Sequence, residues 1–120
     1  MNLRLSKPLF VENSKIPVWL SYLSPIEIGA ITLGPVVISR GTMSDTTKNH
    51  ETIHWQQYIE LAIIGFLLMY LIYWLIGLIK YRDGSKAYYQ IPFEQEAYQN
   101  HDNPYYLITR KRYCWRKYSI

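Results

Sequence analysis

Two histidines in this chain are spaced to bind one metal ion. Residues 50–54 read H-E-T-I-H, and side chains at positions i and i+4 of a helix lie on the same face. The imidazoles of a helical His50 and His54 can therefore reach one ion from consecutive turns. Glu51 lies beside them and can take a proton from a water molecule that the ion activates. The spacing predicts a metal-binding helix with a general base.

A hydrolytic zinc site needs a third protein ligand and an open coordination position. Suitable donor atoms occur elsewhere in the chain at Glu60, Glu94, Glu96, His101, Asp102 and Cys114. Glu60 follows His54 by six positions, so we expect it to face elsewhere on the same helix. A lone cysteine in an aromatic tail is more typical of a packed thiol than of a ligand. Glu94 and Glu96 are about 200° apart on a helix, so only one of them can face the ion.

The residues before the motif have the composition of a strand. Residues 28–39 are rich in Ile, Val and Thr, which favours a strand or a tight hairpin. Pro35 predicts an edge position or a bend after Gly34, because proline cannot donate to a sheet. In a zinc peptidase, such a strand would border the cleft and hold an extended substrate by main-chain hydrogen bonds.

The length of 120 residues predicts a single domain. We expect a mainly helical α+β fold in which the HExxH helix follows the short strand or hairpin. The expected parts are an irregular N-terminal arm at 1–27 with one short element at 18–23, a strand region at 28–39, the HExxH helix and an apolar membrane segment at 46–80, a third-ligand helix at 92–102, and a basic aromatic tail at 104–120. Pro92 suits the first turn of a helix because its φ angle is fixed.

The composition indicates contact with a membrane. Hydrophobic residues make up 49% of the chain and charged residues only 18%, against roughly 25% charged in soluble domains. This composition excludes a disordered chain. Residues 61–79 carry no charge, and as a helix they would cover about 28 Å, close to the thickness of a bilayer core.

The end of the chain is basic and aromatic. Five cations lie close together there: Arg110, Lys111, Arg112, Arg116 and Lys117. Such a cluster attracts phosphate groups of nucleic acids or of lipids. Next to an apolar segment it favours lipid headgroups, and we do not expect nucleic-acid binding. The single cysteine excludes an intramolecular disulfide and a multi-cysteine metal site.

The order H-E-T-I-H followed by E-Q-E-A resembles the gluzincin zinc peptidases, in which a Glu on a second helix completes the site. The resemblance implies a minimal zincin-like fold with zinc bound by His50, His54 and Glu94, and with Glu51 as the catalytic base. Tyr98 stands where the gluzincin pattern has Asp. It either supplies a hydroxyl in place of that Asp, which orients a ligand His, or points at the substrate.

The chain also resembles a group of small bacterial and phage membrane proteins. Their pattern is H-E-x-I-H-x-x-Q, an apolar helix, A-Y-x-x-I-x-F-E-x-E-A-Y, and an aromatic tail. The matching segments here are residues 50–57, 61–79, 87–98 and 113–118. The resemblance covers the chain from about residue 28 and supports a metal site, but it implies nothing about the substrate.

A zinc site and a single straight membrane span exclude each other here. If residues 61–79 crossed the bilayer, His54 and Glu94 would lie on opposite sides, because an unpaired backbone cannot return through lipid. We therefore expect the apolar segment to break near Gly65. Two short helices would then enter one leaflet or lie in the interface.

These residues predict a membrane-associated zinc metallopeptidase that cleaves peptide or protein substrates. The Lys and Arg excess and the free Cys114 place the site and the tail on the cytoplasmic face. An alternative is a non-catalytic membrane scaffold or assembly factor with a structural or vestigial metal site. A third is a single-span protein without metal. A fourth protein ligand such as His101 would favour a structural site, whereas an open position would favour hydrolysis.

Overall fold

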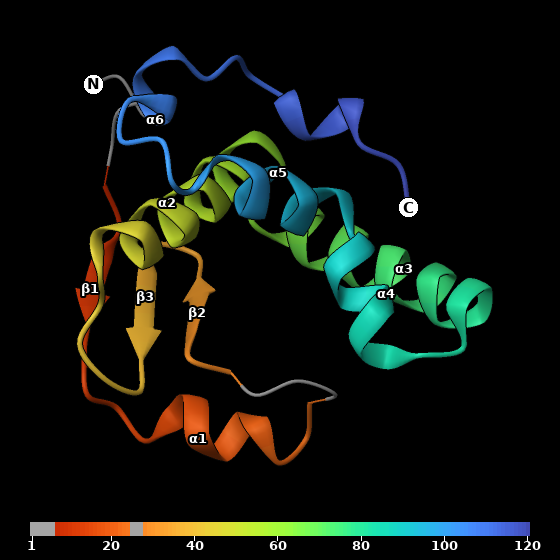
Figure 1. Cartoon of the computed structure of the whole chain (residues 1–120), viewed down its shortest axis with the longest axis horizontal. Coiled ribbons are helices and arrows are strands. Elements are labelled where there is room, and N and C mark those ends of the chain that lie inside the picture. Colours follow the sequence, from red (N-terminus) through yellow and green to blue (C-terminus); the bar gives the residue numbers. More distant parts are fainter. Residues whose placement is uncertain (1–6, 25–27) are drawn as a thin grey trace.

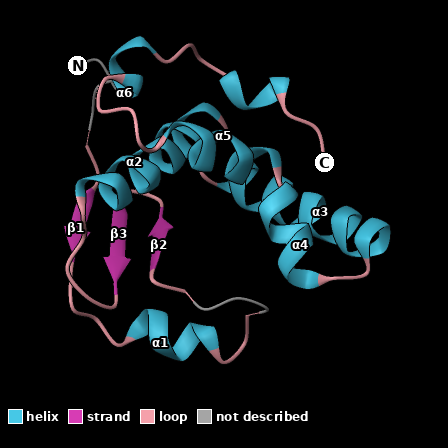
Figure 2. Cartoon of the chain, viewed as in Figure 1, coloured by secondary structure: helices cyan, strands magenta, loops and turns pink. Residues whose placement is uncertain are grey.

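The computed structural model describes residues 7–24 and 28–120 and combines a small sheet with several helices (Figure 1; Figure 2). The strands are β1 (Leu9–Val11), β2 (Ala30–Leu33) and β3 (Val36–Ser39). The helices are α1 (Ile16–Ser21), α2 (Asp45–Glu60), α3 (Ile64–Tyr81), α4 (Gly84–Gln90), α5 (Pro92–Asn100), α6 (Tyr106–Thr109) and the 3-10 helix η2 (Cys114–Lys117). The expected α+β architecture with mainly helical content is confirmed.

The sheet has the order β1-β3-β2, with β1 parallel and β2 antiparallel to β3. The expected hairpin is formed by β2 and β3, which turn at Gly34 with a φ of +62°. Residues next to a two-residue turn form a hydrogen-bonded pair, so the main-chain groups of Ala30 and Thr32 point away from β3. No strand of the described residues covers that edge of β2.

The N-terminal arm is more ordered than the sequence suggests. The short element expected at residues 18–23 corresponds to α1, which lies two residues earlier, whereas β1 was not expected. Residues 1–6 and 25–27 of the arm lie outside the described residues. Strand β1 pairs with β3, from Leu9 with Val36 to Val11 with Ile38. This pairing joins segments far apart in the sequence, so local composition could not reveal it. Pro17 lies in the first turn of α1, where its fixed φ angle is tolerated.

Helix α2 begins at a well-defined cap. The Ser44 hydroxyl accepts a hydrogen bond from the Thr47 backbone N–H at 3.1 Å, which satisfies one of the free donors at the start of the helix. Asp45 in the first turn complements the helix dipole. Several buried side chains of α2 are polar, namely His50, Glu51, His54, Gln56 and Gln57. These buried polar groups need hydrogen-bond partners on the elements that pack against α2.

The apolar segment does break, but earlier than expected. Helix α2 ends at Glu60, α3 begins at Ile64, and Gly65 lies inside α3. Ala62 and Ile63 have positive φ angles of 55° and 63°, and the Ile64 N–H donates to the Ala62 carbonyl at 2.6 Å. This is a strained γ-turn. The turn must be complete before residue 66, because the Phe66 ring packs on the Tyr58 ring with centroids 3.9 Å apart.

Helix α3 packs against α4, which the sequence did not predict. A Cβ atom on Gly77 would lie 3.0 Å from the Ala87 Cβ, so the two helices meet with almost no space between them. The Trp74 indole N–H donates to the Gly84 carbonyl at 3.1 Å. By length and composition, α3 is the one helix among the described residues that could cross a membrane.

Buried ionic contacts attach the C-terminal tail to the helices. The Arg110 guanidinium donates to both oxygens of Glu60, at 2.8 and 2.9 Å, and also to both oxygens of Glu96. Burial alone would lower the pKa of Arg110, but the two carboxylates raise it. Glu60 therefore faces away from the histidines, as expected. Arg110 itself is only 3% exposed, so it is not one of the headgroup-binding cations that the sequence suggested.

Arg110→Ala should lower the free energy of unfolding by about 3–5 kcal/mol, because it leaves two carboxylates without their cation, one of them fully buried. Chemical denaturation measures the change. The matched control is Arg112→Ala, which removes an exposed cation of the same tail and should change stability by less than about 0.5 kcal/mol. Equal stabilities of the two variants would show that Arg110 does not hold the tail in place.

Candidate metal centre

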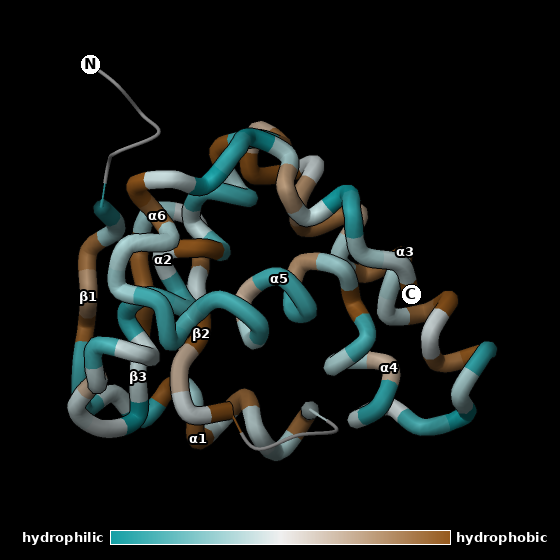
Figure 3. The backbone as a smooth tube through the Cα atoms, turned by 45° about the horizontal axis from the view of Figure 1, so that its top comes forward, coloured by the Kyte–Doolittle hydropathy of each residue, from teal (hydrophilic) through white to brown (hydrophobic). Residues whose placement is uncertain are grey.

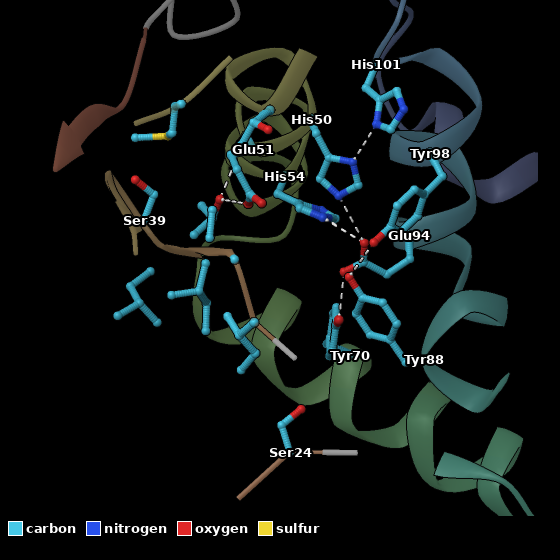
Figure 4. A pocket seen from close by; sticks show the side chains of 18 of the residues that line it. Ser24, Ser39, His50, Glu51, His54, Tyr70, Tyr88, Glu94, Tyr98 and His101 are labelled. Carbon is cyan, nitrogen blue, oxygen red and sulfur yellow. Dashed lines mark hydrogen bonds and ion pairs between the residues drawn. The ribbon is translucent and has the colours of Figure 1, made fainter. Parts of the chain in front are cut away.

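Three side chains from two helices meet at one point. His50 and His54 extend from α2, and Glu94 extends from α5 (Figure 4). The Glu94 Oε1 atom lies 3.2 Å from His50 Nε2 and 3.1 Å from His54 Nε2. All three residues are buried, and their potential ligand atoms lie within 4.8 Å of one another. The ligand set expected from the resemblance is thus assembled in the structure, and this cluster could hold a metal ion.

The cluster has suitable dimensions for a tetrahedral ion. Zinc binds nitrogen and oxygen ligands at about 2.0–2.2 Å, so two ligands of a tetrahedral site lie about 3.4 Å apart. The separations of 3.1 and 3.2 Å between Glu94 and the two histidines are close to that value. Two imidazoles and one carboxylate also match the donor set of hydrolytic zinc sites. The donor set and these two separations therefore fit a zinc ion.

The Gln57 amide determines which nitrogen of His54 faces the cluster. The Gln57 NH₂ group donates to the Phe93 carbonyl at 3.1 Å and to the Glu96 carboxylate at 3.0 Å. Because both partners only accept, the amide oxygen must be the atom that lies 2.8 Å from His54 Nδ1. That nitrogen therefore donates its proton, which leaves Nε2 as the atom available to a metal ion.

His101 contacts Nδ1 of His50, as Gln57 contacts Nδ1 of His54. The Nδ1 atoms of the two rings are 3.0 Å apart, on the side of His50 that faces away from Glu94. Burial and the nearby charge of His50 lower the pKa of His101. A neutral His101 can accept the Nδ1 proton of His50 and hold its Nε2 toward the cluster. His101 therefore orients a ligand and does not act as a fourth one.

Charge is concentrated on Glu94 and His54. Burial would raise the pKa of Glu94, but the two histidines hold it well below its ordinary value. Burial would likewise lower the pKa of His54, but the Glu94 carboxylate raises it to about 9. Without a metal ion, the cluster is therefore an ion pair between a His54 imidazolium and the Glu94 carboxylate. A bound cation takes the place of that proton.

Tyr70 is a member of the site that the sequence did not reveal. Its hydroxyl donates to Glu94 Oε2 at 2.7 Å, which leaves the other carboxylate oxygen to face the histidines (Figure 4). Tyr70 lies on α3 and reaches Glu94 only because the chain reverses after α2. No local spacing signals such a contact, since it depends on the turn at residues 61–63.

Tyr98 lies beside His50, but its hydroxyl contacts Tyr88. Its ring packs edge-on against the His50 ring with centroids 4.5 Å apart, and its hydroxyl lies 3.1 Å from that of Tyr88. Burial raises the pKa of Tyr98 to about 12, so its hydroxyl stays protonated at neutral pH. The residue that contacts the outer nitrogen of His50 is His101, not Tyr98. Tyr98 is left as a hydrogen-bond donor that lines the cavity.

Glu51 is tied to the sheet. The Thr32 hydroxyl donates to Glu51 Oε2 at 2.6 Å, and the Thr32 carbonyl accepts from the Tyr58 hydroxyl at 2.8 Å. Glu51 and the three ligands line one cavity of about 820 Å³, which β2 also borders. The predicted base, the metal cluster and the uncovered strand edge thus face a common space.

The other candidate ligands lie outside the cluster. Glu96 is fully buried and binds Arg110 together with the Tyr106 hydroxyl, at 2.8 Å from the latter. The half-buried Cys114 sulfur lies 3.5 Å from that same hydroxyl. Asp102 is exposed. Searches of family models, curated proteins and solved structures found no match to this chain.

Metal binding should become tighter as the pH rises toward 9. Because the pKa of His54 is raised to about 9, an incoming cation must displace a proton at any lower pH. Zinc affinity should therefore increase by about tenfold per pH unit between pH 6.5 and 9. Competition with a chromophoric chelator measures this slope. A flat profile would show that His54 is already neutral in the metal-free protein.

Gln57→Leu should weaken zinc binding by about 10- to 100-fold, because His54 loses the acceptor that fixes its orientation. The same chelator competition measures the affinity, and circular dichroism checks the fold. Gln99→Leu is the matched control, since Gln99 is exposed on α5 and should bind zinc as the wild type does. An unchanged zinc affinity in Gln57→Leu would show that Gln57 does not orient His54.

Proposed function

We propose that this protein is a membrane-associated zinc metallopeptidase. The observation that carries the proposal is a second carboxylate beside a complete ligand set. Glu51 lines the same cavity as His50, His54 and Glu94 but belongs to no ligand pair with them. Hydrolysis requires a base beside the metal, and Glu51 is a buried carboxylate that can serve as one.

Each residue of the site has a role in peptide hydrolysis. When bound, zinc polarises the scissile carbonyl and lowers the pKa of water. Glu51, oriented by Thr32, takes the proton from the attacking water and passes it to the leaving amine. Tyr98 and Tyr88 place protonated hydroxyls near the cluster, and Tyr98 can donate to the oxygen on which negative charge develops.

The uncovered edge of β2 suits an extended peptide. A substrate strand that adds to this edge would meet the main-chain groups of Ala30 and Thr32, and it would lie next to Glu51. The Thr32 carbonyl already accepts from Tyr58, so pairing is directed to the Ala30 end of the strand. The substrate is therefore a stretch of unfolded or locally extended chain.

The position of His101 favours catalysis over a structural or vestigial site. A fourth protein ligand would close the coordination sphere, and His101 was the residue suited to that role. It contacts the outer nitrogen of His50 instead of facing the cluster. Among the described residues, only three have ligand atoms close enough for one ion, and a three-ligand site keeps a position for water.

Membrane association is proposed from α3, whose length and composition suit a bilayer. Because α3 folds back on α2, the metal ligands lie on one side of any membrane that it contacts. Exposed Lys111, Arg112, Arg116 and Lys117 in the tail favour the cytoplasmic face. A free thiol at Cys114 agrees with a reducing compartment.

Glu51→Gln should keep zinc and lose peptidase activity. Protein purified without chelators should carry about one zinc per chain by elemental analysis. The amide of Gln cannot take a proton, so cleavage of a peptide library should fall by at least about 100-fold. His54→Ala should lose both zinc and activity. Wild-type protein that binds zinc but cleaves no peptide would instead support the scaffold alternative.

Single cysteines at Lys48 and Lys86 should report the same side of the membrane. In a Cys114→Ser background, an impermeant thiol reagent should label both positions only after cell lysis, since both lie on the cytoplasmic face. A cysteine in a known periplasmic or extracellular loop is the positive control. Labelling of the two positions from opposite sides would mean that α3 spans the bilayer.

A further inference from the structure

A continuous apolar stripe runs along the full length of α3. Its members are spaced by three or four residues and therefore share one face: Ile64, Leu67, Leu68, Leu71, Ile72, Leu75, Ile76 and Ile79. Each is between 44% and 79% exposed, and Figure 3 shows hydrophobic residues recurring along this helix. An uninterrupted patch of this kind marks a surface that contacts a partner or a membrane.

The opposite face of α3 excludes a position across the bilayer. It packs through Gly77 and Trp74 against α4. Within α3, the Tyr70 hydroxyl donates to the Glu94 carboxylate. A transmembrane α3 would draw this carboxylate and the histidines beside it into hydrocarbon, where burial of charged groups is costly. A helix with one face covered by polar structure and the other face apolar lies in the plane of the interface.

The C-terminal end of α3 is basic. Lys80, Arg82 and Lys86 are exposed there, and the ammonium groups of both lysines lie over the Tyr81 ring, at 5.3 and 4.7 Å. Cations and tyrosine beside an apolar face are typical of the headgroup region of a membrane. Anionic headgroups complement this charge, whereas a second copy of the chain would bring the same net charge of +4.

The composition of the stripe also favours lipid. Cores of protein interfaces are enriched in aromatic residues, Met and Arg, and they carry hydrogen bonds. The stripe consists of Leu and Ile alone and has no hydrogen-bonding side chain. The aromatic residues Phe66, Tyr70 and Tyr73 of α3 instead face inward, against Phe93. A surface of aliphatic side chains without polar groups matches acyl chains.

The stripe is continuous with the cavity of the metal site. Leu67 and Leu71 belong to the stripe and also line the cavity. On another wall the lining includes Leu23, which is 88% exposed and follows the exposed Trp19 and Tyr22 of the α1 region. Apolar side chains from two separate segments thus border the same opening.

We infer that the cavity of the metal site opens onto the lipid surface and takes its substrates from there. The α3 stripe and Leu23 enter the headgroup region, with α3 flat on the membrane. The substrates are then extended segments of membrane proteins close to the bilayer, not freely diffusing peptides. This substrate class rests on the proposed peptidase function, whereas the lipid contact does not.

Fluorescence quenching tests the lipid contact without any activity. Single cysteines at Leu23, Ile76 and Gln99, in a Cys114→Ser background, are labelled with an environment-sensitive fluorophore. On vesicles of phosphatidylcholine and phosphatidylglycerol, lipid-borne quenchers should quench the labels at Leu23 and Ile76 but not at Gln99. An unquenched label at Leu23 would show that the cavity opening faces water. Unquenched labels at both Leu23 and Ile76 would show that this side of the protein does not contact lipid.

Tethering tests the substrate class. The same randomised ten-residue peptides are offered free in solution or anchored by a transmembrane helix in the vesicles, and anchored peptides should be cleaved at least 10-fold faster. Leu68→Gln combined with Ile72→Gln alters the stripe without touching the cavity lining. This variant should cleave anchored and free peptides at the same rate. It should keep its zinc and the wild-type rate of cleavage of free peptides.

The outcomes separate the two proposals. Equal rates on free and anchored peptides would overturn the substrate class and leave the peptidase function intact. A zinc-loaded protein that cleaves neither kind of peptide would overturn the peptidase function, and the substrate class with it. In that case the quenching result still decides whether the opening contacts lipid.

Discussion

One carboxylate oxygen, Glu94 Oε1, lies between two imidazoles in the interior of the protein. A buried charge of this kind is tolerated only when it is paired and hydrogen-bonded. Much of the fold provides those partners: α2 supplies the histidines and α3 supplies the Tyr70 hydroxyl. The polar inner face of α2, which would otherwise weaken a hydrophobic core, follows from this requirement.

Helix α5 carries two buried carboxylates that face different networks. Glu94 faces the histidines, whereas Glu96 faces Arg110 and the tail. Gln57 touches both networks, since its amide oxygen accepts from His54 and its NH₂ group donates to Glu96. A disturbance of the Arg110 contacts is therefore transmitted through one side chain to a ligand of the candidate metal site. The two networks have to be considered together when the site is altered.

The features that could be predicted from the sequence are those set by local spacing. The HExxH helix, the hairpin at Gly34 and the helix after Pro92 follow from periodicity and turn residues, and the resemblance to gluzincins pointed to Glu94. The break in the apolar segment followed from the conflict between ligands and bilayer, although its position did not. Strand β1, helix α4 and the roles of Tyr70 and His101 depend on contacts between distant segments. His50 and His101, for example, are 51 positions apart, and no sequence periodicity reports such a pair.

The separation between partners also affects how the protein is made. Gln57 forms a hydrogen bond with Phe93, which is synthesised 36 positions later, and Glu60 pairs with Arg110, which is synthesised 50 positions later. A ribosome releases α2 and α3 before these partners, so the apolar face of α3 is available before the ligand set can close. Any contact of α3 with a membrane during synthesis would therefore precede assembly of the candidate metal centre. In this order of events, His50, His54 and Glu94 come together only after the whole of α3 has been synthesised.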